Sequence, residues 1–274
     1  MKTKYSSLFS LPYLIWSLIF IIVPMGLVVV FAFTTESGQF TLDYVSQVGE
    51  YTNVLVRSVW LAAIATVICL LIGYPLAFIM SRMPGFQQRT MLMLIMLPMW
   101  MNFLLRTYAW MTILEKNGLL NKLLGLVGLG PFDMINTQGA VVLGMVYNYL
   151  PFMILPLYSI MTKIDNRTIE AAQDLGANTK NVFTRIVIPM SMPGISTGIT
   201  MVFVPSVSTF IISRMLGGGG NLLIGDLIDL QFLGNAYNPH LGSAISLVLM
   251  VLILLCMSVL NQFNGDEDRE GMLL

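Results

Sequence analysis

Six long apolar runs constrain this 274-residue chain more than any other feature of its sequence. A helix needs about 20 mostly apolar residues to cross the ~30 Å hydrocarbon layer of a bilayer. Backbone N–H and C=O groups find no water in that layer, so a crossing segment must be helical to satisfy them internally. The sequence therefore predicts an all-α integral membrane protein with six transmembrane helices, at residues 11–33, 59–81, 91–114, 139–161, 195–213 and 243–260.

The composition supports a membrane protein and argues against several other classes. Hydrophobic residues make up 56% of the chain and charged residues only 10%, whereas soluble domains carry about 25% charged residues. Basic and acidic residues number 14 each, so no basic excess indicates a nucleic-acid partner. Cys69 and Cys256 lie inside apolar runs, where a disulfide framework is not expected. Lys2 and Lys4 precede the first run as in a signal peptide, but its length of about 23 residues favours a retained span.

The distribution of basic residues predicts the orientation of the spans. Lys and Arg concentrate in short loops on the cytoplasmic side of a membrane. With the N-terminus inside, nine basic residues lie on the inner side and five on the outer side or at span ends. Both termini are therefore expected in the cytoplasm. The acidic run at 264–271 predicts a solvated, disordered end.

A polar stretch between the fourth and fifth runs faces the cytoplasm in this orientation; it reads EAAQDLGANTKNVFTRIVIP, at 170–189. Asp165 is a typical N-cap for a short helix, and Gly176 suits the left-handed residue that ends it. Asn178 can cap a second helix, which Pro189 and Pro193 are expected to end before the fifth span begins. The pattern predicts two short helices joined by a sharp turn, with a solvated connector as the alternative.

The spacing within this stretch resembles the signature of ABC importer permeases, EAA-x3-G-x9-I-x-LP. Ile188 stands where Leu is usual, which preserves apolar volume. In that family the stretch docks on a separate ATPase subunit. The resemblance implies this coupling role for the segment 165–189, and within it for Glu170, Ala171, Ala172, Asp174, Gly176, Ile186 and Pro189.

Other stretches resemble the spermidine/putrescine permeases, and among them the first of the two permease types. They are GYPLAF at 73–78, LPMWMNFLLRTYAW at 97–110, LPFMILPLYS at 150–159 and NLLIGDLIDLQFL at 221–233. The resemblance implies one transmembrane permease domain over 1–274, with a cytoplasmic tail at 261–274, in a bacterial plasma membrane. It also implies four partner subunits: a second homologous permease in a heterodimer, two ATPase subunits and an extracytoplasmic substrate-binding protein. ATP and Mg²⁺ would bind to the ATPase, and this chain would hold no cofactor.

Patterns typical of enzymes and metal sites are missing from the sequence. No G-x-x-x-x-G-K-[ST] motif occurs, and the run Gly217–Gly220 is followed by Asn221 and Leu222, so a flexible outer turn is expected there. His240 is the only histidine, an outer surface group that leaves no Cys/His cluster for a metal and no nucleophile elbow beside it. The chain is predicted to be a permease and no enzyme. An importer of another solute (an amino acid, an anion or an iron chelate) and a stand-alone secondary transporter are the alternatives.

Residues that suit a cationic cargo define a candidate substrate path. A polyamine is a flexible polycation, so its path should offer aromatic faces and carboxylates. Prolines in or near the spans free backbone carbonyls, and a wet path would expose them. The candidates are Trp100, Asn102, Tyr108, Trp110, Tyr147, Tyr149, Ser206, Asp226 and Asp229. An interfacial, packing or solvated role is the alternative for each of them.

Arg106 lies inside the third predicted span and needs a separate explanation. A charge there costs about 2.5–3.5 kcal/mol on insertion scales. It would repel a polycation, so we do not expect it in the cargo path. Trp110 follows one helical turn later, where its indole face is expected to shield the guanidinium. These features favour a structural or gate-stabilising role.

Overall fold

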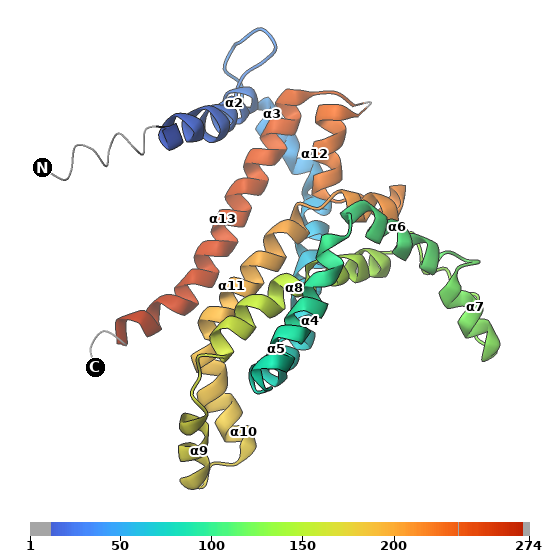
Figure 1. The fold of residues 1–274 in the computed structure, drawn as a ribbon. Helices are drawn as coiled ribbons and strands as arrows, with labels where there is room; N and C mark the ends of the chain where they lie inside the picture. The colour runs from blue at the N-terminus through green and yellow to red at the C-terminus, as the bar shows by residue number, and fades with distance from the viewer. Residues whose placement is uncertain (1–11, 235, 271–274) are drawn as a thin grey trace, which may run out of the picture. The chain divides into compact units, whose positions relative to one another are not determined.

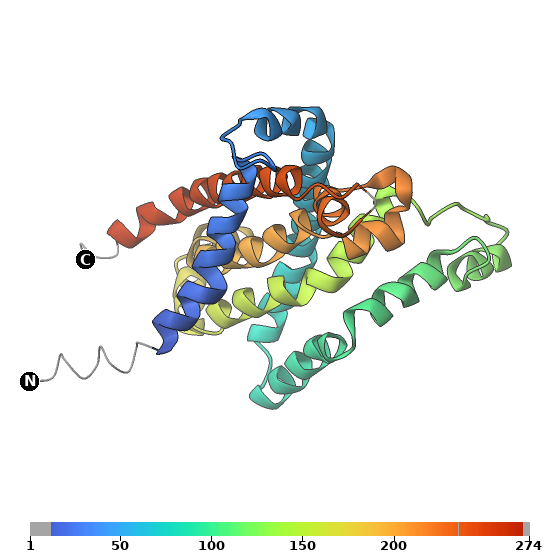
Figure 2. The same cartoon turned by 90° about the horizontal axis from the view of Figure 1, so that it is seen from above.

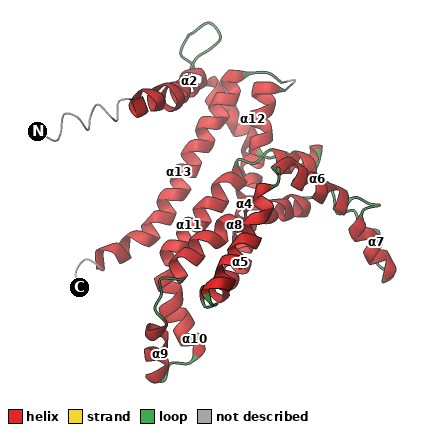
Figure 3. Cartoon of the chain, in the orientation of Figure 1, coloured by secondary structure: helices red, strands yellow, loops and turns green. Residues whose placement is uncertain are grey.

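The structure is a computed structural model that describes residues 12–234 and 236–270. Over these residues the chain is helical, apart from turns and an isolated bridge between Thr34 and Phe40 (Figures 1 and 3). The all-α prediction is therefore confirmed. The elements are η1 Leu18–Ile22, α2 Val23–Ala32, α3 Asp43–Gln47, η2 Val48–Tyr51, α4 Thr52–Ser81, α5 Gly85–Met96, η3 Leu97–Trp100, α6 Phe103–Leu114, α7 Leu119–Leu126, α8 Gln138–Met161, α9 Asn166–Asp174, α10 Thr179–Val182, η4 Phe183–Val187, α11 Ile188–Val207, η5 Ser213–Gly217, η6 Gly219–Asn221, α12 Ile224–Leu233 and α13 Pro239–Glu270.

Five of the described helical segments are long and apolar enough to cross a membrane: Pro12–Ala32, Asp43–Ser81, Gln138–Met161, Thr179–Val207 and Pro239–Val259. A bent pair, Gly85–Trp100 with Phe103–Leu126, brings the number to six if the pair counts as one span. Internal contacts divide the chain into two units. The first joins the N-terminal part through Leu55 to Leu227–Leu254, and the second contains Val56–Asp226 with the C-terminal end from Leu255.

The third predicted span, 91–114, is not one straight helix. It breaks at Met101, whose backbone is extended, and the two parts meet at 88°. Pro98 lacks the N–H needed to continue the helical ladder. Asn102 then starts α6 afresh, because its Oδ1 accepts hydrogen bonds from the N–H groups of Leu104 (2.8 Å) and Leu105 (3.4 Å). The apolar run concealed this break because both of its parts are hydrophobic.

The expected end of the second short helix at Pro189 and Pro193 is wrong. Helix α10 continues through the π-helical turn η4 into α11, where Pro189 lies in the first turn and Pro193 in the interior. In η4 the N–H of Ile188 bonds to the carbonyl of Phe183, five residues earlier. The π-helical turn that directly precedes Pro189 accommodates it within the continuous helix. The fifth span is therefore continuous with the polar segment before it.

The core of the second unit is built from α4, α8 and α11. Helices α8 and α11 lie side by side in both views (Figures 1 and 2). Their approach depends on glycines: a Cβ on Gly194 would lie 3.1 Å from the carbonyl oxygen of Pro156, and one on Gly198 would lie 2.6 Å from Sδ of Met153. Close packing of small residues is what holds helices together in lipid, where burial of apolar surface gives little gain.

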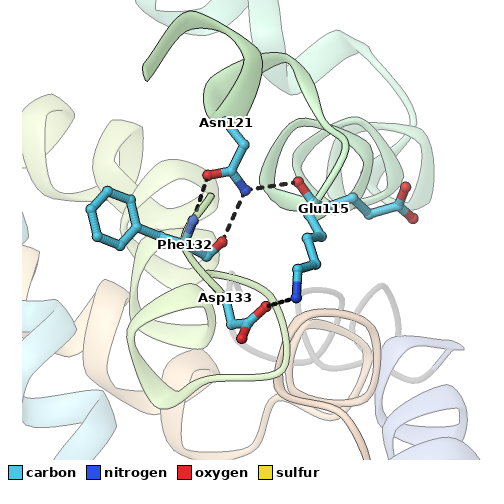
Figure 4. A network of polar contacts seen from close by, with 5 residues as sticks. Glu115, Asn121, Phe132 and Asp133 are labelled. Atoms are coloured by element: carbon cyan, nitrogen blue, oxygen red, sulfur yellow. Dashed lines mark hydrogen bonds and ion pairs between the residues drawn. The ribbon is translucent and has the colours of Figure 1, made fainter. Parts of the chain in front are cut away.

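An asparagine organises the loop that follows α6. Asn121, in α7, is 5% exposed, and its amide donates to the carbonyl oxygens of Glu115 (3.2 Å) and Phe132 (2.9 Å) (Figure 4). Its Oδ1 accepts the N–H of Phe132 at 2.9 Å. One buried side chain thus satisfies three backbone groups and fixes both ends of the loop.

His240 and the acidic tail also differ from expectation. His240 lies in the first turn of α13, half-buried, with Nδ1 3.0 Å from the carbonyl oxygen of Phe31 and its ring 5.4 Å from that of Tyr44. It is a packed residue of the first unit.

Helix α13 runs to Glu270, so the predicted disorder at 264–271 is wrong over the described part of that run. Residue 271 lies outside the described residues.

Candidate functional site

The polar segment 165–189, here called the coupling segment, is a hairpin of two short helices. Oδ1 of Asp165 accepts the N–H of Arg167 at 3.0 Å and caps α9. Gly176 has φ +85°, and Oδ1 of Asn178 accepts the N–H of Asn181 at 2.8 Å to cap α10. The two predicted caps and the left-handed glycine are confirmed. In Figure 1, α9 and α10 lie together beyond the ends of α8 and α11.

The hairpin has a small core and an exposed face. Ile164, Val182 and Val187 are buried together and pack against partly buried neighbours that include Ile169 and Ala172. The hairpin therefore has a small apolar core of its own.

The exposed face of the hairpin carries Glu170, Ala171 and Asp174, with Leu175 90% exposed at the turn. A large exposed apolar side chain surrounded by small and acidic groups on a packed hairpin is suited to burial by another protein. Ile186 and Pro189 are half-buried, in η4 and at the start of α11, so they do not belong to this face. Five of the seven predicted coupling residues therefore lie in the hairpin itself, and these two lie where it joins the membrane span.

Arg82 fastens the hairpin to the end of α4, and sequence reasoning missed this role. Its Nη1 donates to the carbonyl oxygen of Ile164 at 3.1 Å and to Oδ1 of Asn166, and the guanidinium lies 5.5 Å from the ring centre of Phe78. Burial lowers the pKa of Arg82 below its ordinary value, yet a guanidinium titrates far above neutral pH and stays charged. The sequence showed only a basic residue on the inner side, because its partners are 82 and 84 positions away.

The aromatic candidates for the substrate path fall into two groups. Trp100, at the end of η3, is 76% exposed, and Tyr108, in the middle of α6, is 53% exposed. Trp110 and Tyr147 are half-buried and meet edge to face, with ring centres 5.3 Å apart. Helices α6 and α8 thus bring one aromatic pair together inside the bundle.

The polar candidates are mostly engaged with the backbone. Asn102 caps α6, and the hydroxyl of Tyr149 donates to the carbonyl oxygen of Pro205 at 3.4 Å. Ser206 is fully buried, and its hydroxyl donates to the carbonyl oxygen of Val202 at 2.6 Å. Ser206 therefore has a packing role, with its hydroxyl bonded to the backbone of its own helix.

Asp226 is not the outer exposed carboxylate that the sequence indicated. It is 0% exposed; its Oδ2 accepts the N–H of Leu223 at 2.9 Å, and its Oδ1 lies 3.8 Å from Nε of Arg214. The N–H of the next residue, Ile224, donates to Oγ of the buried Ser58 at 2.8 Å. The start of α12 is therefore tied down by buried polar groups. Asp229 lies one turn later in α12 and is half-buried.

We expect Asp226→Ala to destabilise the folded protein by roughly 1–3 kcal/mol, because the N–H of Leu223 and Arg214 lose a buried partner. The control is Asp133→Ala, which removes a carboxylate 3.5 Å from Lys116 in an ion pair whose side chains are 80% and 65% exposed. An exposed pair of this kind contributes about 0–1 kcal/mol. The melting temperature, measured by thermal unfolding in detergent, should fall clearly more for Asp226→Ala than for Asp133→Ala. Equal melting temperatures would contradict the structural role of Asp226.

Arg106 is buried as expected for a structural residue, but its partner is different. It is 8% exposed, and its guanidinium lies 5.9 Å from the ring centre of Phe103 rather than over Trp110. Trp110 is turned toward Tyr147 instead. Among the described residues, Nε and Nη1 of Arg106 have no hydrogen-bond partner. Phe103 and Trp110 each lie about one turn from Arg106 along α6, so the sequence permitted a contact with either ring. The packing of Trp110 against Tyr147 of α8 leaves Phe103 as the ring beside Arg106.

Known proteins similar to this chain agree with the architecture. Residues 70–264 match the family model for the "Binding-protein-dependent transport system inner membrane component". The chain is 40% identical to the "Spermidine/putrescine transport system permease protein PotB" of Haemophilus influenzae over 93% of this chain and 92% of that protein. Its identity to the protein of the same name from Escherichia coli is 37%, over 87% and 90% of the two chains.

Two solved structures share the fold. One is a bacterial ABC transporter involved in the import of the acidic polysaccharide alginate, with a TM-score of 0.75 over 96% of this chain and 94% of that chain, at 20% identity. The other is the alginate transporter in complex with an alginate pentasaccharide-bound periplasmic protein, with a TM-score of 0.78 over 94% and 92% at 19% identity. The family match covers more than half of the chain, and the 40% identity extends over nearly all of it. This protein therefore belongs to the family of inner membrane components of binding-protein-dependent transport systems.

Proposed function

We propose that this chain is the permease subunit of an ATP-driven importer that takes up spermidine and putrescine. The observation that carries the proposal is the 40% identity to a spermidine/putrescine permease along almost the full length of both chains. The capped hairpin supports the proposal, because its exposed Glu170, Ala171 and Leu175 form a surface that a second protein can bind. The chain itself carries out no catalysis in this proposal.

The proposed membrane arrangement is a single domain of six spans with both termini in the cytoplasm. The bent pair α5–η3 and α6 counts as the third span, and the coupling segment lies between the fourth and the fifth. The excess of Lys and Arg on the inner side supports this orientation. Two ATPase subunits, which bind ATP and Mg²⁺, would contact the coupling segments of this chain and of a second, homologous permease. A loaded substrate-binding protein would dock from outside.

Transport then follows from a shift between two arrangements of the spans. Closure of the ATPase dimer on ATP pulls the coupling segments together and opens the path outward, and hydrolysis restores the inward state. Such a shift requires contacts that differ between the two states. The proposed cargo-facing groups are Trp100 and Asn102 at the break, Tyr108 and Trp110 on α6, and Tyr147 and Tyr149 on α8.

A second candidate is an importer of another small solute, such as an amino acid, an anion or an iron chelate. The observation that favours it is the fold itself, which is shared with transporters of an acidic polysaccharide. The fully buried Asp226 also removes one of the two carboxylates that the sequence offered to a cation. A transporter that works alone on an ion gradient is the remaining alternative.

Uptake of labelled spermidine tests the proposal directly. Cells lacking this chain should take up spermidine only at the background level, and the wild-type gene should restore uptake. Exposed Glu170 should be needed for this rescue, so Glu170→Lys should fail because it reverses the charge on the docking face. Glu36→Lys, a charge reversal at an exposed position before α3, serves as the matched control and should restore uptake. Equal uptake with and without the chain would remove the polyamine assignment.

A further inference from the structure

The inner end of α4 carries a row of side chains that contact the coupling segment and the start of α11. Tyr74, Phe78 and Arg82 are spaced at i, i+4 and i+8, so they follow one face of the helix and its continuation. Tyr74 and Phe78 make ring contacts, and Tyr74 and Arg82 make hydrogen bonds. Together they connect α4 to the element that the proposed function assigns to the ATPase.

Phe183 occupies the centre of this row. Its ring meets the ring of Tyr74 at 5.6 Å and 79°, and that of Phe78 at 5.5 Å and 84°. Edge-to-face contacts are favoured because the positive edge of one ring meets the negative face of the other. Phe183 is also the first residue of the π-helical turn η4. The ring therefore sits where the hairpin passes into α11.

The two ends of the row bind residues that flank the coupling segment, Ser191 just after it and Ile164 just before it. Ser191 donates its proton to the carbonyl oxygen of Ile188 at 2.9 Å, so the hydroxyl of Tyr74 must be the donor in the buried 2.8 Å bond between Tyr74 and Ser191. At the other end, Arg82 donates to the carbonyl oxygen of Ile164, just before the segment. A displacement of the hairpin thus acts on α4 at both places.

Helix α4 has a weak point at one end of the row, where Gly73 and Pro75 flank Tyr74. Pro75 lies inside the helix and cannot donate to the ladder, so one backbone hydrogen bond is missing there. Gly73 faces α8 so closely that a Cβ would lie 3.1 Å from Cγ of Met153. A change of direction at this place would shift Ala77 and Met80, which are buried against α8, so the bend must carry these contacts with it.

We infer that Tyr74, Phe78, Arg82 and Phe183 form a joint through which the inner end of α4 moves with the coupling segment as one body, with Gly73–Pro75 as the hinge. This inference rests on the proposed function, because the ATPase must drive the segment. The four are positioning residues: they act by passing a displacement to α4. The joint converts movement at the cytoplasmic surface into bending of a membrane span.

The first test uses the complete importer, with its ATPase and binding protein, in liposomes. Phe183→Leu keeps an apolar side chain but loses the ring, and Tyr74→Phe loses only the hydroxyl. Both variants should keep the ATPase bound and hydrolysing ATP, while spermidine imported per ATP falls by about fivefold or more, the lower end of the range for coupling between sites. Phe152→Leu, a partly buried ring of the same core cluster on α8, is the matched control and should keep the ratio.

A second measurement needs no cargo. Spin labels at Gln87 and Thr184, both exposed, report the distance between the residues that follow α4 and the coupling segment. In the wild type this distance should be the same with and without ATP plus vanadate, and in Phe183→Leu it should change. The inference is overturned if the wild-type distance changes with nucleotide. It is also overturned if Phe183→Leu imports as much spermidine per ATP as the wild type. If the wild-type chain retains no ATPase, the proposed function fails instead, so the two failures are distinguishable.

Discussion

Replacement of Gly176 by valine is expected to abolish transport while the membrane-spanning part of the chain stays folded. Gly176 has φ +85°, and a Cβ there would meet nothing within 4 Å. The cost is therefore conformational: a β-branched residue resists the left-handed region by roughly 1–2 kcal/mol. The hairpin would turn differently after α9 and present Glu170 and Leu175 in another direction. The measurement is co-purification of the ATPase together with uptake of labelled cargo.

Gly38 provides a control matched in backbone strain. It has φ +78° and also has open space around a Cβ, but it lies in the turn between Thr34 and Phe40 of the first unit. Gly38→Val should therefore cost the same strain and leave the ATPase bound. If Gly176→Val retained the ATPase and normal uptake, the hairpin would not be the coupling element.

Replacement of Gly225 by alanine is expected to prevent accumulation of folded protein. A Cβ at this position would lie 2.5 Å from the carbonyl oxygen of Ser208 and 2.6 Å from that of Thr209. These are backbone atoms of the turn that follows α11, so they cannot yield by a change of rotamer. Overpacking of cores costs about 1–3 kcal/mol even where side chains can adjust, and a clash with backbone belongs at the upper end. The yield of monodisperse protein after detergent extraction checks this expectation.

Gly219 and Gly220, a few positions earlier, serve as controls in the same loop. A Cβ on either would meet nothing within 4 Å. Their alanine variants should be extracted in normal yield. A normal yield of Gly225→Ala as well would mean that the start of α12 is not held against the end of α11 as the structure has it.

Much of the candidate coupling site was predictable because its determinants are local. A capping side chain acts on N–H groups two or three residues away, so Asp165 and Asn178 could be recognised from the sequence. The left-handed turn at Gly176 likewise follows from its position after a helix. The continuation of α10 into α11 was missed because a π-helical turn accommodates Pro189, and no residue pattern marks such a turn.

The substrate path was predicted less well because it depends on contacts across the bundle. Asp226 and Asp229 look alike as carboxylates in one helix, yet Asp226 is fully buried and Asp229 is only half-buried. Arg106 has ring-bearing residues on both sides of it along α6, and the pairing of Trp110 with Tyr147 leaves Phe103 as its neighbour.

The sequence by itself determined that this chain is helical and lies in a membrane, since runs of about 20 apolar residues leave no other way to satisfy the backbone in lipid. It also determined the polar hairpin, whose caps and turn act within a few residues. Only the tertiary structure decided the break in the third span and the contacts made by Tyr74, Phe78 and Arg82. The physical reason is the range of the forces. Backbone satisfaction and capping act locally along the chain, whereas ring contacts and buried hydrogen bonds join residues that only folding brings together.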